Sequence, residues 1–496
     1  MRKPVLWDHP LRVVQPMRSV RPIRSDQPIL LAVCTFALAA LVVGSAASSA
    51  SAQVTCFGDP TCVQPETGYA VGRRGTPNIE VVSHIPLPGV RFSHADIDVE
   101  QEMDRPFVYI SQRMGASGFY AISIEDEKNP EVVYRYVVDD PDLHLGTGCV
   151  DIKHAKAEGR YYVIVSCQFG QGGPDFDLGA MVFDVTGLPD GSTVRKVADL
   201  RLPDLPGGFH NVFTYRHSNG RSLLLATTQS KDAFIYDIAQ LAAGNLDPVS
   251  TIAVPEPRAN RTRQWHDMYM GFLPDAGQDR FYGAGTGGFH VFDLTDVENP
   301  RLLTSVTGIP GVQDGHTFTP TPDGRYGLGM PEPTYQHSPI RFFDLRPPGS
   351  EGQTPNIVRG SGIGAWIAKF GGATHNHEMR WPYVFISAQD DGLQIVNMAD
   401  PTHPFTEGYY HTRQGPALWG GGTRPSQATT GNIYDGAWGV DIRDADGLIV
   451  VSDLNTGFWA FRMDGFQGWN GNDWNMPNVS SAQMWDQSPD QPQQIR

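Results

Sequence analysis

The sequence predicts an all-β fold, a seven-bladed β-propeller whose last blade is closed by an N-terminal strand. Three observations predict it. Glycine (54) and proline (39) are abundant among the 496 residues and charged residues make up only 19%, which indicates many turns and few solvent-facing helices. Seven similar units follow one another along the chain. A strand-like segment precedes the first unit, and the last unit lacks its equivalent.

Each unit reads as a short strand, a turn that often contains Asp-Gly or Gly-Arg, and a second strand rich in Tyr, Phe, Val and Ile. A glycine, a third strand ending in Phe-Asp or similar, and often an Asn-Pro or Asp-Pro break follow. The units begin at His94, Cys149, His210, His266, His316, His377 and Trp438, so consecutive starts are 50 to 61 residues apart. Four strands per unit at this spacing favour propeller blades, because a two-sheet sandwich needs no seven equivalent units.

The first element in chain order is a secretory signal, predicted over residues 1–52. A basic region precedes the apolar run 29–47, and Ala50-Ser51-Ala52 forms a cleavage site, so we expect cleavage before Gln53. An uncleaved membrane anchor is the alternative. A polar segment over residues 53–76 follows, in which Cys56 and Cys62 could form a local disulfide after export. These features predict a periplasmic or secreted protein with no membrane span after cleavage.

The propeller itself is expected over residues 77–465. Residues 77–89 (PNIEVVSHIPLPG) match residues 300–311 (PRLLTSVTGIPG), a fourth strand that leads into the next unit. No such strand follows Met463, so the N-terminal strand should complete the last blade and remove its exposed edge. Residues 466–496 are rich in Asn, Gln and Pro and are expected to form a tail of loop.

The third strands and breaks resemble those of LVIVD-repeat proteins. The segments are GLQIVNMADPTHP (392–404), FHVFDLTDVENP (289–300) and FYAISIEDEKNP (119–130), with aliphatic residues before an acidic residue and a proline break. The resemblance is clear in the first segment, looser elsewhere, and covers most of residues 77–463. It implies an exported β-propeller. It implies no particular reaction, because the family as a whole lacks a single established one and a fold alone supplies none.

Aligned on their turns, the seven units place histidine at one repeated position. The residues at this position are His94, Cys149, His210, His266, His316, His377 and Trp438. Histidine accounts for only 15 residues in the chain, so five at one repeat position exceed a chance arrangement. The position begins the first strand of each unit, which lies beside the central axis of a propeller. Equivalent side chains should therefore meet at one mouth of the channel.

Converging imidazoles predict a transition-metal site. Neutral histidine binds zinc through a ring nitrogen at about 2.0–2.1 Å, and imidazole also suits copper and iron. The sequence predicts copper, iron, manganese or zinc at His94, His210, His266, His316 and His377, of which a tetrahedral ion would use three or four. Carboxylates commonly hold the second ring nitrogen. The supporting or alternative residues are Cys149, Asp96, Asp151, Asp267, Glu378 and His375.

Cys149 takes the place of a histidine, and a hairpin at residues 157–160 brings it near Cys167. A disulfide, a metal ligand and a reactive thiol are all open for this residue. The histidines also have a structural alternative, since repeated blades can carry histidines that hydrogen-bond within the blade and bind nothing.

Two functions are therefore predicted. The first is an exported metalloprotein, in which the metal serves an enzyme, either an oxidoreductase or a hydrolase, acting on a small molecule. The second is a non-catalytic propeller that binds protein or glycan at a face, with Trp265, Trp366, Trp419, Trp469 and Trp474 as contacts or as buried packing residues. Residues 1–52 carry +4 of a total charge of −16, which leaves −20 for the remainder. An acidic body argues against a nucleic-acid partner.

Overall fold

The computed structural model describes residues 74–89, 92–114, 116–139, 146–169, 177–332, 339–347, 349, 352–360, 362–368, 374–389, 391–412, 436–469 and 485–487. All of them belong to one compact unit within residues 52–496. The predicted signal peptide, Cys56 and Cys62 lie outside the described residues. So do Trp419, Trp474 and most of the tail. No helix in the described ranges is long and apolar enough to cross a membrane.

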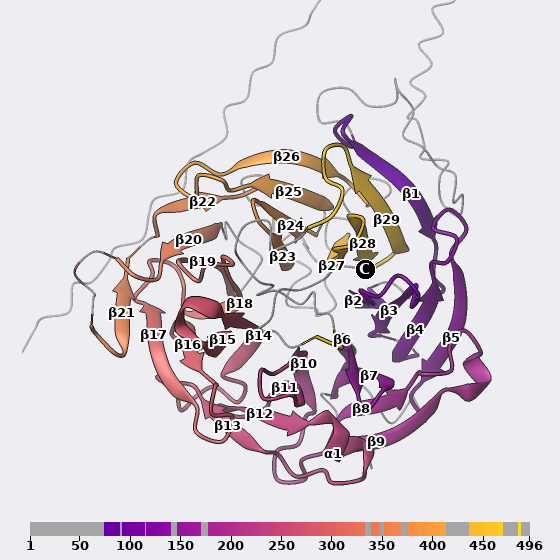
Figure 1. The fold of residues 1–496 in the computed structure, drawn as a ribbon, viewed down its shortest axis with the longest axis horizontal. Helices are drawn as coiled ribbons and strands as arrows, with labels where there is room; N and C mark the ends of the chain where they lie inside the picture. Colours follow the sequence, from indigo (N-terminus) through magenta and orange to yellow (C-terminus); the bar gives the residue numbers. More distant parts are fainter. Residues whose placement is uncertain are drawn as a thin grey trace, which may run out of the picture. The chain divides into compact units, whose positions relative to one another are not determined.

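Seven sheets surround a common centre in Figure 1, with one strand of each sheet beside the centre and the last at the rim. Blade 1 contains β2 (His94–Val99), β3 (Phe107–Gln112), β4 (Gly118–Ser123) and β5 (Glu131–Val137). Blade 2 contains β6 (Gly146–Ala157), β7 (Arg160–Phe169), β8 (Leu178–Asp184) and β9 (Arg195–Arg201). Blade 3 contains β10 (Phe209–Arg216), β11 (Ser222–Thr228), β12 (Asp232–Asp237) and β13 (Ser250–Ala253).

Blade 4 contains β14 (Trp265–Leu273), β15 (Gln278–Gly285), β16 (Gly288–Asp293) and β17 (Arg301–Thr307). Blade 5 contains β18 (Asp314–Pro320), β19 (Tyr326–Glu332), β20 (Ile340–Asp344) and β22 (Gly364–Trp366). Blade 6 contains β23 (Asn376–Arg380), β24 (Tyr383–Ser387), β25 (Leu393–Asn397) and β26 (Phe405–Tyr410). Blade 7 contains β27 (Ala437–Arg443), β28 (Leu448–Asp453), β29 (Gly457–Met463) and β1 (Ile79–Ile85). The predicted seven-bladed propeller is confirmed.

The N-terminal strand closes the last blade as predicted. β1 pairs antiparallel with β29 from Ile79 opposite Met463 to Ile85 opposite Phe458, with one register shift at residues 81–83. This pairing leaves blade 7 with strands from both ends of the repeat region. It satisfies the outer edge of β29, which would otherwise present unpaired backbone groups.

Blade 4 differs from the predicted four strands. A fifth strand, β21 (Asn356–Arg359), pairs in parallel with β17 at the rim, and it comes from the segment between the third and fourth strands of blade 5. The sequence repeat could not show it, because the strand belongs to an insertion in one unit only. The helical segments are equally local: α1 (Ile238–Ala242) and the 3-10 turns η1 (Gly191–Thr193) and η2 (Pro274–Ala276).

The core lies between the faces of adjacent blades. Phe119 of blade 1 meets Phe183 of blade 2 edge-on at 5.0 Å between ring centroids, and Phe289 of blade 4 stacks on Phe318 of blade 5 at 5.0 Å. Glycine is required where such rings meet a strand. A Cβ at Gly329 of β19 would lie 2.4 Å from the ring of Phe289, closer than real contacts allow. Aromatic strand residues and glycines thus fix the blade-to-blade packing that positions the inner strands.

Part of the predicted loop tail also packs on the propeller. Trp485 is 3% exposed, and its indole Nε1 lies 3.2 Å from Nε2 of His154 on β6. The next residue, Asp486, forms an ion pair with Lys156 at 2.5 Å. The tail therefore has an anchored turn at residues 485–487, on the blade 2 strand that lines the channel.

Candidate metal centre at the channel mouth

The innermost strands of six blades carry a β-bulge near their start, and β23 of blade 6 pairs without a register shift. In blade 3 the ladder runs from Phe209 opposite Thr228 to Val212 opposite Ala226, so two residues, His210 and Asn211, face one residue of β11. The ladders of β2, β6, β14, β18 and β27 shift in the same way, at residues 94–97, 149–151, 265–267, 315–317 and 437–439. A bulge re-aims side chains and often lies beside a functional site.

The bulges define which residues are equivalent around the channel. A hydroxyl on the second strand donates to the carbonyl of the first bulge residue in the next blade: Ser166 to His210 at 2.7 Å, Thr227 to His266 at 3.0 Å and Ser387 to Trp438 at 2.6 Å. Ser452 does the same to Ala95. The mouth ring is therefore Ala95, Val150, His210, His266, His316, His375 and Trp438.

The structural register differs from the sequence alignment in three blades. His94 and Cys149 each precede the ring position by one residue, and His377 follows it by two. The alignment on turns fails because the hairpins differ in length. Residues 100–106 connect β2 to β3, whereas only residues 381–382 connect β23 to β24. Counting residues back from the turn therefore selects the wrong ring residue in these three blades. The bulges and bridging hydroxyls identify the equivalent residues.

The three displaced residues have other surroundings. The imidazole of His94 is buried, with its ring 6.1 Å from that of Tyr120. His377 is buried between strands, and its Nε2 lies 2.8 Å from Oγ1 of Thr319. Cys149 is the register partner of Cys167, and the two form a disulfide, so no thiolate is present at this position.

Four histidines of the mouth ring lie in contact along an arc of four adjacent blades. Nε2 of His210 is 3.2 Å from Nε2 of His266. The ring centroids of His266 and His316 are 4.0 Å apart, and those of His316 and His375 are 4.8 Å apart. His375 in turn stacks on Trp438 at 3.5 Å. The structure thus brings together three of the five predicted ligands, with His375 in the place expected for His377.

Acceptors on the far side of two rings, those of His210 and His375, fix their orientation. Nδ1 of His210 lies 2.9 Å from Oε1 of Gln168, and Nδ1 of His375 lies 2.9 Å from the carbonyl oxygen of Trp438. Both acceptors require an Nδ1–H donor. The Nε2 atoms of these rings therefore carry the lone pair, which is the arrangement that metal-ligating histidines adopt.

His316 is held through a relay. Its Nδ1 lies 2.7 Å from Oγ1 of Thr317, and that hydroxyl lies 3.2 Å from Oδ2 of Asp267. Because the carboxylate accepts the hydroxyl proton, the Thr317 oxygen can accept Nδ1–H, which leaves Nε2 of His316 with its lone pair. Asp267 thus takes the predicted role of a carboxylate that supports a ring histidine, although it acts through a threonine.

Burial keeps three of the imidazoles, those of His210, His316 and His375, neutral. It lowers the pKa of His210 and His316 well below the usual value, and the charge of Arg263 and the neighbouring imidazoles act in the same direction. Burial also lowers the pKa of His375 to about 3. Neutral rings are the form that binds a cation, so these three rings have the protonation state that a metal ligand needs.

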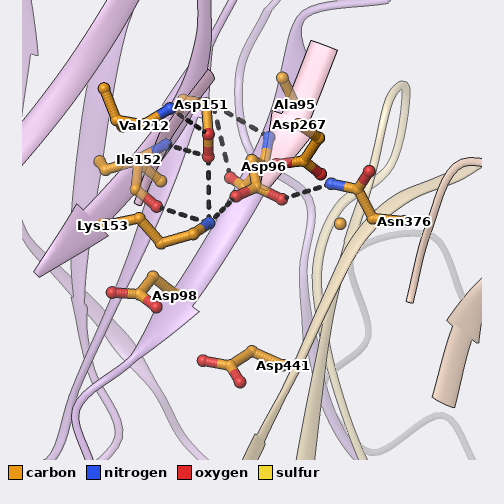
Figure 2. A network of polar contacts seen from close by, with 12 residues as sticks. Ala95, Asp96, Asp98, Asp151, Ile152, Lys153, Val212, Asp267, Asn376 and Asp441 are labelled. Carbon is orange, nitrogen blue, oxygen red and sulfur yellow. Dashed lines mark hydrogen bonds and ion pairs between the residues drawn. The ribbon is translucent and has the colours of Figure 1, made fainter. Parts of the chain in front are cut away.

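A second layer of the channel, just past the histidines, is acidic. The second bulge residues include Asp96, Asp151 and Asp267, and the ammonium of Lys153 reaches Asp96 and lies 3.0 Å from Asp151 (Figure 2). Although burial opposes it, Lys153 lowers the pKa of Asp96. Burial raises the pKa of Asp151 well above its usual value, and the charge of Asp96 adds to the effect. Burial raises the pKa of Asp267 to about 7.

These carboxylates join neighbouring blades. Oδ2 of Asp151 accepts the backbone N–H of Val212 in the next blade at 2.7 Å, as Figure 2 shows. Oδ2 of Asp441 accepts the N–H of Val99 at 2.9 Å across the closure of the ring. Inner strands of different blades share no ladder, so such bridges satisfy their backbone groups. Asp96 and Asp151 are therefore structural links, and neither hydrogen-bonds a ring histidine.

Glu378 lies one layer deeper, where Tyr269 donates to it at 2.7 Å and Arg380 contacts it at 3.2 Å. The carboxylate layers line a small cavity of about 10 Å³. This is room for about one water molecule. Among the described residues, the channel below the histidines is thus largely filled by side chains.

The histidines are not arranged around one point. In the described part of the chain, no three His, Cys, Asp or Glu side chains already form a ligand set for a metal ion. The arc arrangement explains this result, because only His210 and His266 bring their nitrogens together. A third ring has to rotate toward this pair to complete a site.

Sequence reasoning missed the partners that orient the rings. Gln168, Thr317 and Trp438 are ordinary residues in the repeat, and only the bulge register places them beside imidazoles. It also left the tryptophans open as surface contacts. Trp265, Trp366 and Trp469 are buried, so they pack the core.

The comparisons identify no family. No family model matches the chain, and no curated protein matches it. Similar solved structures include "COPII on membranes, outer coat vertex", at TM-score 0.47 and 11% identity over 75% of this chain and 85% of that chain. Another is "The structure of the COPII coat assembled on membranes", at TM-score 0.47 and 11% identity. That match covers 75% of this chain and 47% of that chain. The chain is a seven-bladed β-propeller, and its resemblance to LVIVD-repeat proteins stays a prediction.

Proposed function

We propose that His210, His266, His316 and His375 bind a transition-metal ion at the channel mouth. The observation that carries the proposal is the contact of 3.2 Å between Nε2 of His210 and Nε2 of His266. Two imidazole nitrogens at about 2.0–2.1 Å from one tetrahedral ion are about 3.3 Å apart. The pair therefore already has the separation of two ligands on one ion.

The chemistry of the donors supports the same proposal. Nδ1 of His210 and His375 faces a carbonyl-type acceptor, so each presents the lone pair of Nε2. His316 lies beside His266 at 4.0 Å between centroids, within reach of a small ring rotation. An all-imidazole set with no thiolate suits copper, zinc or iron. Once bound, such an ion would supply Lewis-acid or redox chemistry, as an oxidoreductase or a hydrolase requires.

The 3.2 Å contact also allows a second candidate, a purely structural cluster. His266 could donate Nε2–H to His210, and the chain of rings from His210 to Trp438 would then only fill the mouth. A non-catalytic propeller that binds protein or glycan at a face would need nothing more. Metal content separates the two functions directly.

The test uses untagged full-length protein, reconstituted separately with copper, zinc, iron and manganese and analysed by elemental mass spectrometry. We expect about one ion per chain in the wild type and its loss in the double variant His210→Ala with His266→Ala. His403→Ala is the matched control, because this histidine is 82% exposed and pairs only with its own turn. Circular dichroism checks the fold of each variant. A folded wild type that binds none of the four ions contradicts the proposal.

We also propose that the protein is exported to the periplasm or beyond. The apolar run 29–47 with its cleavage site supports export, and so does the Cys149–Cys167 disulfide, since disulfides persist in oxidising compartments. N-terminal sequencing of the protein from a fractionated host should read from Gln53. A mature protein that begins at residue 1 in the cytoplasmic fraction contradicts it.

A further inference from the structure

The anchored turn of the tail, residues 485–487, is held by β6, the inner strand of blade 2. Indole Nε1 of Trp485 lies 3.2 Å from Nε2 of His154, and the two rings meet edge-on at 6.0 Å between centroids. Lys156 forms an ion pair with Asp486 at 2.5 Å. In Figure 1 the turn is the short yellow segment beside β6. The turn is therefore docked on the propeller through one hydrogen bond and one ion pair.

This docking site is separate from the proposed metal centre. His154 is four residues further along β6 than Val150, the mouth-ring residue of blade 2. At about 3.3 Å per residue, the two positions are about 13 Å apart along the strand. Trp485 is 3% exposed and belongs to the apolar cluster that blades 2 and 3 share. Release of the turn would therefore expose both the indole and part of that cluster.

The other ring nitrogen of His154 is already committed to blade 1. Oδ2 of Asp98 accepts the backbone N–H of His154 at 2.6 Å and lies 2.5 Å from its Nδ1. An ionised carboxylate can only accept, so Nδ1 carries a proton whether the ring is neutral or charged. Nε2 is therefore the atom that changes from acceptor to donor when the ring takes up a proton.

The indole of Trp485 fits only one of these two states. An indole N–H is a donor and offers no lone pair. Neutral His154 accepts this N–H at Nε2, whereas the protonated ring places a second N–H against it at the same 3.2 Å contact. Protonation thus removes the hydrogen bond and leaves two buried donors without an acceptor, which is unfavourable. Docking of the turn and protonation of His154 therefore oppose each other.

Carboxylates of blade 1 favour the protonated ring. Although burial opposes it, the charges of Asp98, Glu100 and Glu102 raise the pKa of His154 to about 9. Both carboxylate oxygens of Glu102 are buried without a hydrogen-bond partner among the described residues, and burial raises the pKa of Glu102. The docked indole and these carboxylates thus act on His154 in opposite directions.

The other titratable neighbours keep one charge state in the range where His154 changes. The ring of Tyr109 on β3 lies 6.5 Å from that of His154, and burial raises the pKa of this phenol well above its usual value. Although burial opposes it, the hydrogen bond to Asp486 raises the pKa of Lys156. Tyr109 therefore stays neutral and Lys156 stays charged near pH 9 and below.

We propose that the turn at residues 485–487 is a pH-dependent latch, docked on blade 2 when His154 is neutral and released when His154 is protonated. Docking holds the ring neutral, so the pKa of His154 is lower in the docked state than in the released state. Docking is therefore strongest above the pKa of the released state and weakens as the pH falls toward that of the docked state. The inference goes beyond the proposed metal site and does not depend on it.

The test is fluorine NMR on full-length protein labelled with fluorotryptophan and titrated from about pH 10 to about pH 6. The signal of Trp485 is identified by its absence in Trp485→Phe. We expect the docked signal to give way to a released signal as the pH falls, by up to about tenfold in the population ratio per pH unit. His403→Ala, which removes an exposed histidine, is the control and should titrate like the wild type. A Trp485 signal that stays unchanged over this range in the folded protein overturns the proposal.

His154→Gln separates the protonation of this ring from other effects of pH. Its amide offers an acceptor to Trp485 and a donor to Asp98 and does not titrate. We expect its turn to stay docked throughout the titration. A glutamine variant that releases the turn with the wild-type pH profile overturns the proposal.

Trp485→Phe provides a second readout that does not require the glutamine variant to fold. It removes the indole N–H and keeps an aromatic ring, so it removes the group that favours neutral His154. We expect the pKa of His154, measured by NMR of labelled histidine, to rise in this variant. A pKa of His154 equal in the wild type and in Trp485→Phe overturns the proposal.

Discussion

The behaviour of single histidines follows from their burial. His290 of β16 lies outside the mouth ring, is fully buried and has Nδ1 3.0 Å from Oγ of Ser305. Burial lowers its pKa from 6.5 to about 4. In the unfolded chain His290 therefore binds a proton below about pH 6.5, whereas in the folded protein it binds one only below about pH 4. The stability that His290 contributes is complete above pH 6.5 and is lost as the pH falls toward 4.

This difference in protonation gives a measurable slope of the free energy of unfolding against pH. We expect the free energy of unfolding of His290→Gln to fall less steeply than that of the wild type between pH 6.5 and 4. The difference should be about 1.4 kcal/mol per pH unit, the value for one proton. Urea titrations at several pH values measure it. Parallel curves for the two proteins would show that the imidazole is not held neutral.

At the scale of elements, the bulge and its bridging hydroxyl set the mouth ring. Oγ1 of Thr227 accepts the N–H of Asn211 at 2.9 Å and donates to the carbonyl of His266 at 3.0 Å, so it ties blade 3 to blade 4. Thr227→Ala leaves two buried backbone groups unpaired. We expect a loss of about 1–3 kcal/mol in the free energy of unfolding, which Thr227→Ser should restore.

Chemical denaturation measures this loss, with Thr402→Ala as a control at an exposed turn where the hydroxyl bonds only Asp400 and His403. A destabilisation equal in Thr227→Ala and Thr402→Ala would mean that the bridge carries no energy. A serine variant as unstable as the alanine variant would mean that the methyl group matters and the hydroxyl does not.

The sequence was sufficient to predict the strands and blades. It was not sufficient to predict which residues of the inner strands occupy equivalent positions. Strand alternation, turns and the repeat predict seven blades and the closing role of residues 77–89. They do not reveal a bulge, since one extra residue leaves no mark in composition or period. The choice of His377 over His375 has a related cause, the short hairpin of residues 381–382, which changes the count from the turn. The orienting groups Gln168 and Thr317 were equally invisible, because they are defined by contacts between blades and not by the repeat.

At the scale of the whole molecule, closure by β1 is the link between the two ends of the repeat region. Ile79 is buried in the cluster that includes Trp459 and Phe461, while the neighbouring Glu80 faces outward. Ile79→Asp places an unpaired carboxylate in that cluster. We expect it to cost more than about 3 kcal/mol and to open the ring, because a buried charge without a partner is among the largest single-residue penalties.

Calorimetry of Ile79→Asp and of its control Glu80→Lys checks this expectation, since both changes fall in the same strand and alter charge. Only the first should lower the melting temperature strongly. A melting temperature unchanged in Ile79→Asp would contradict the role of β1 as the closing strand.

The central claim is that the register of the bulges and bridging hydroxyls, and not the turn, determines which histidines meet at the mouth, where we propose that they bind a metal. Metal stoichiometry of His375→Ala and His377→Ala, compared after identical reconstitution, tests it most directly. The account predicts that His375→Ala loses metal or binds it at least about tenfold more weakly, the effect of losing one ligand or a group that supports one. His377→Ala should retain the wild-type content, because its Nε2 bonds Thr319 within the blade packing. Loss of metal in His377→Ala with full retention in His375→Ala would contradict the claim.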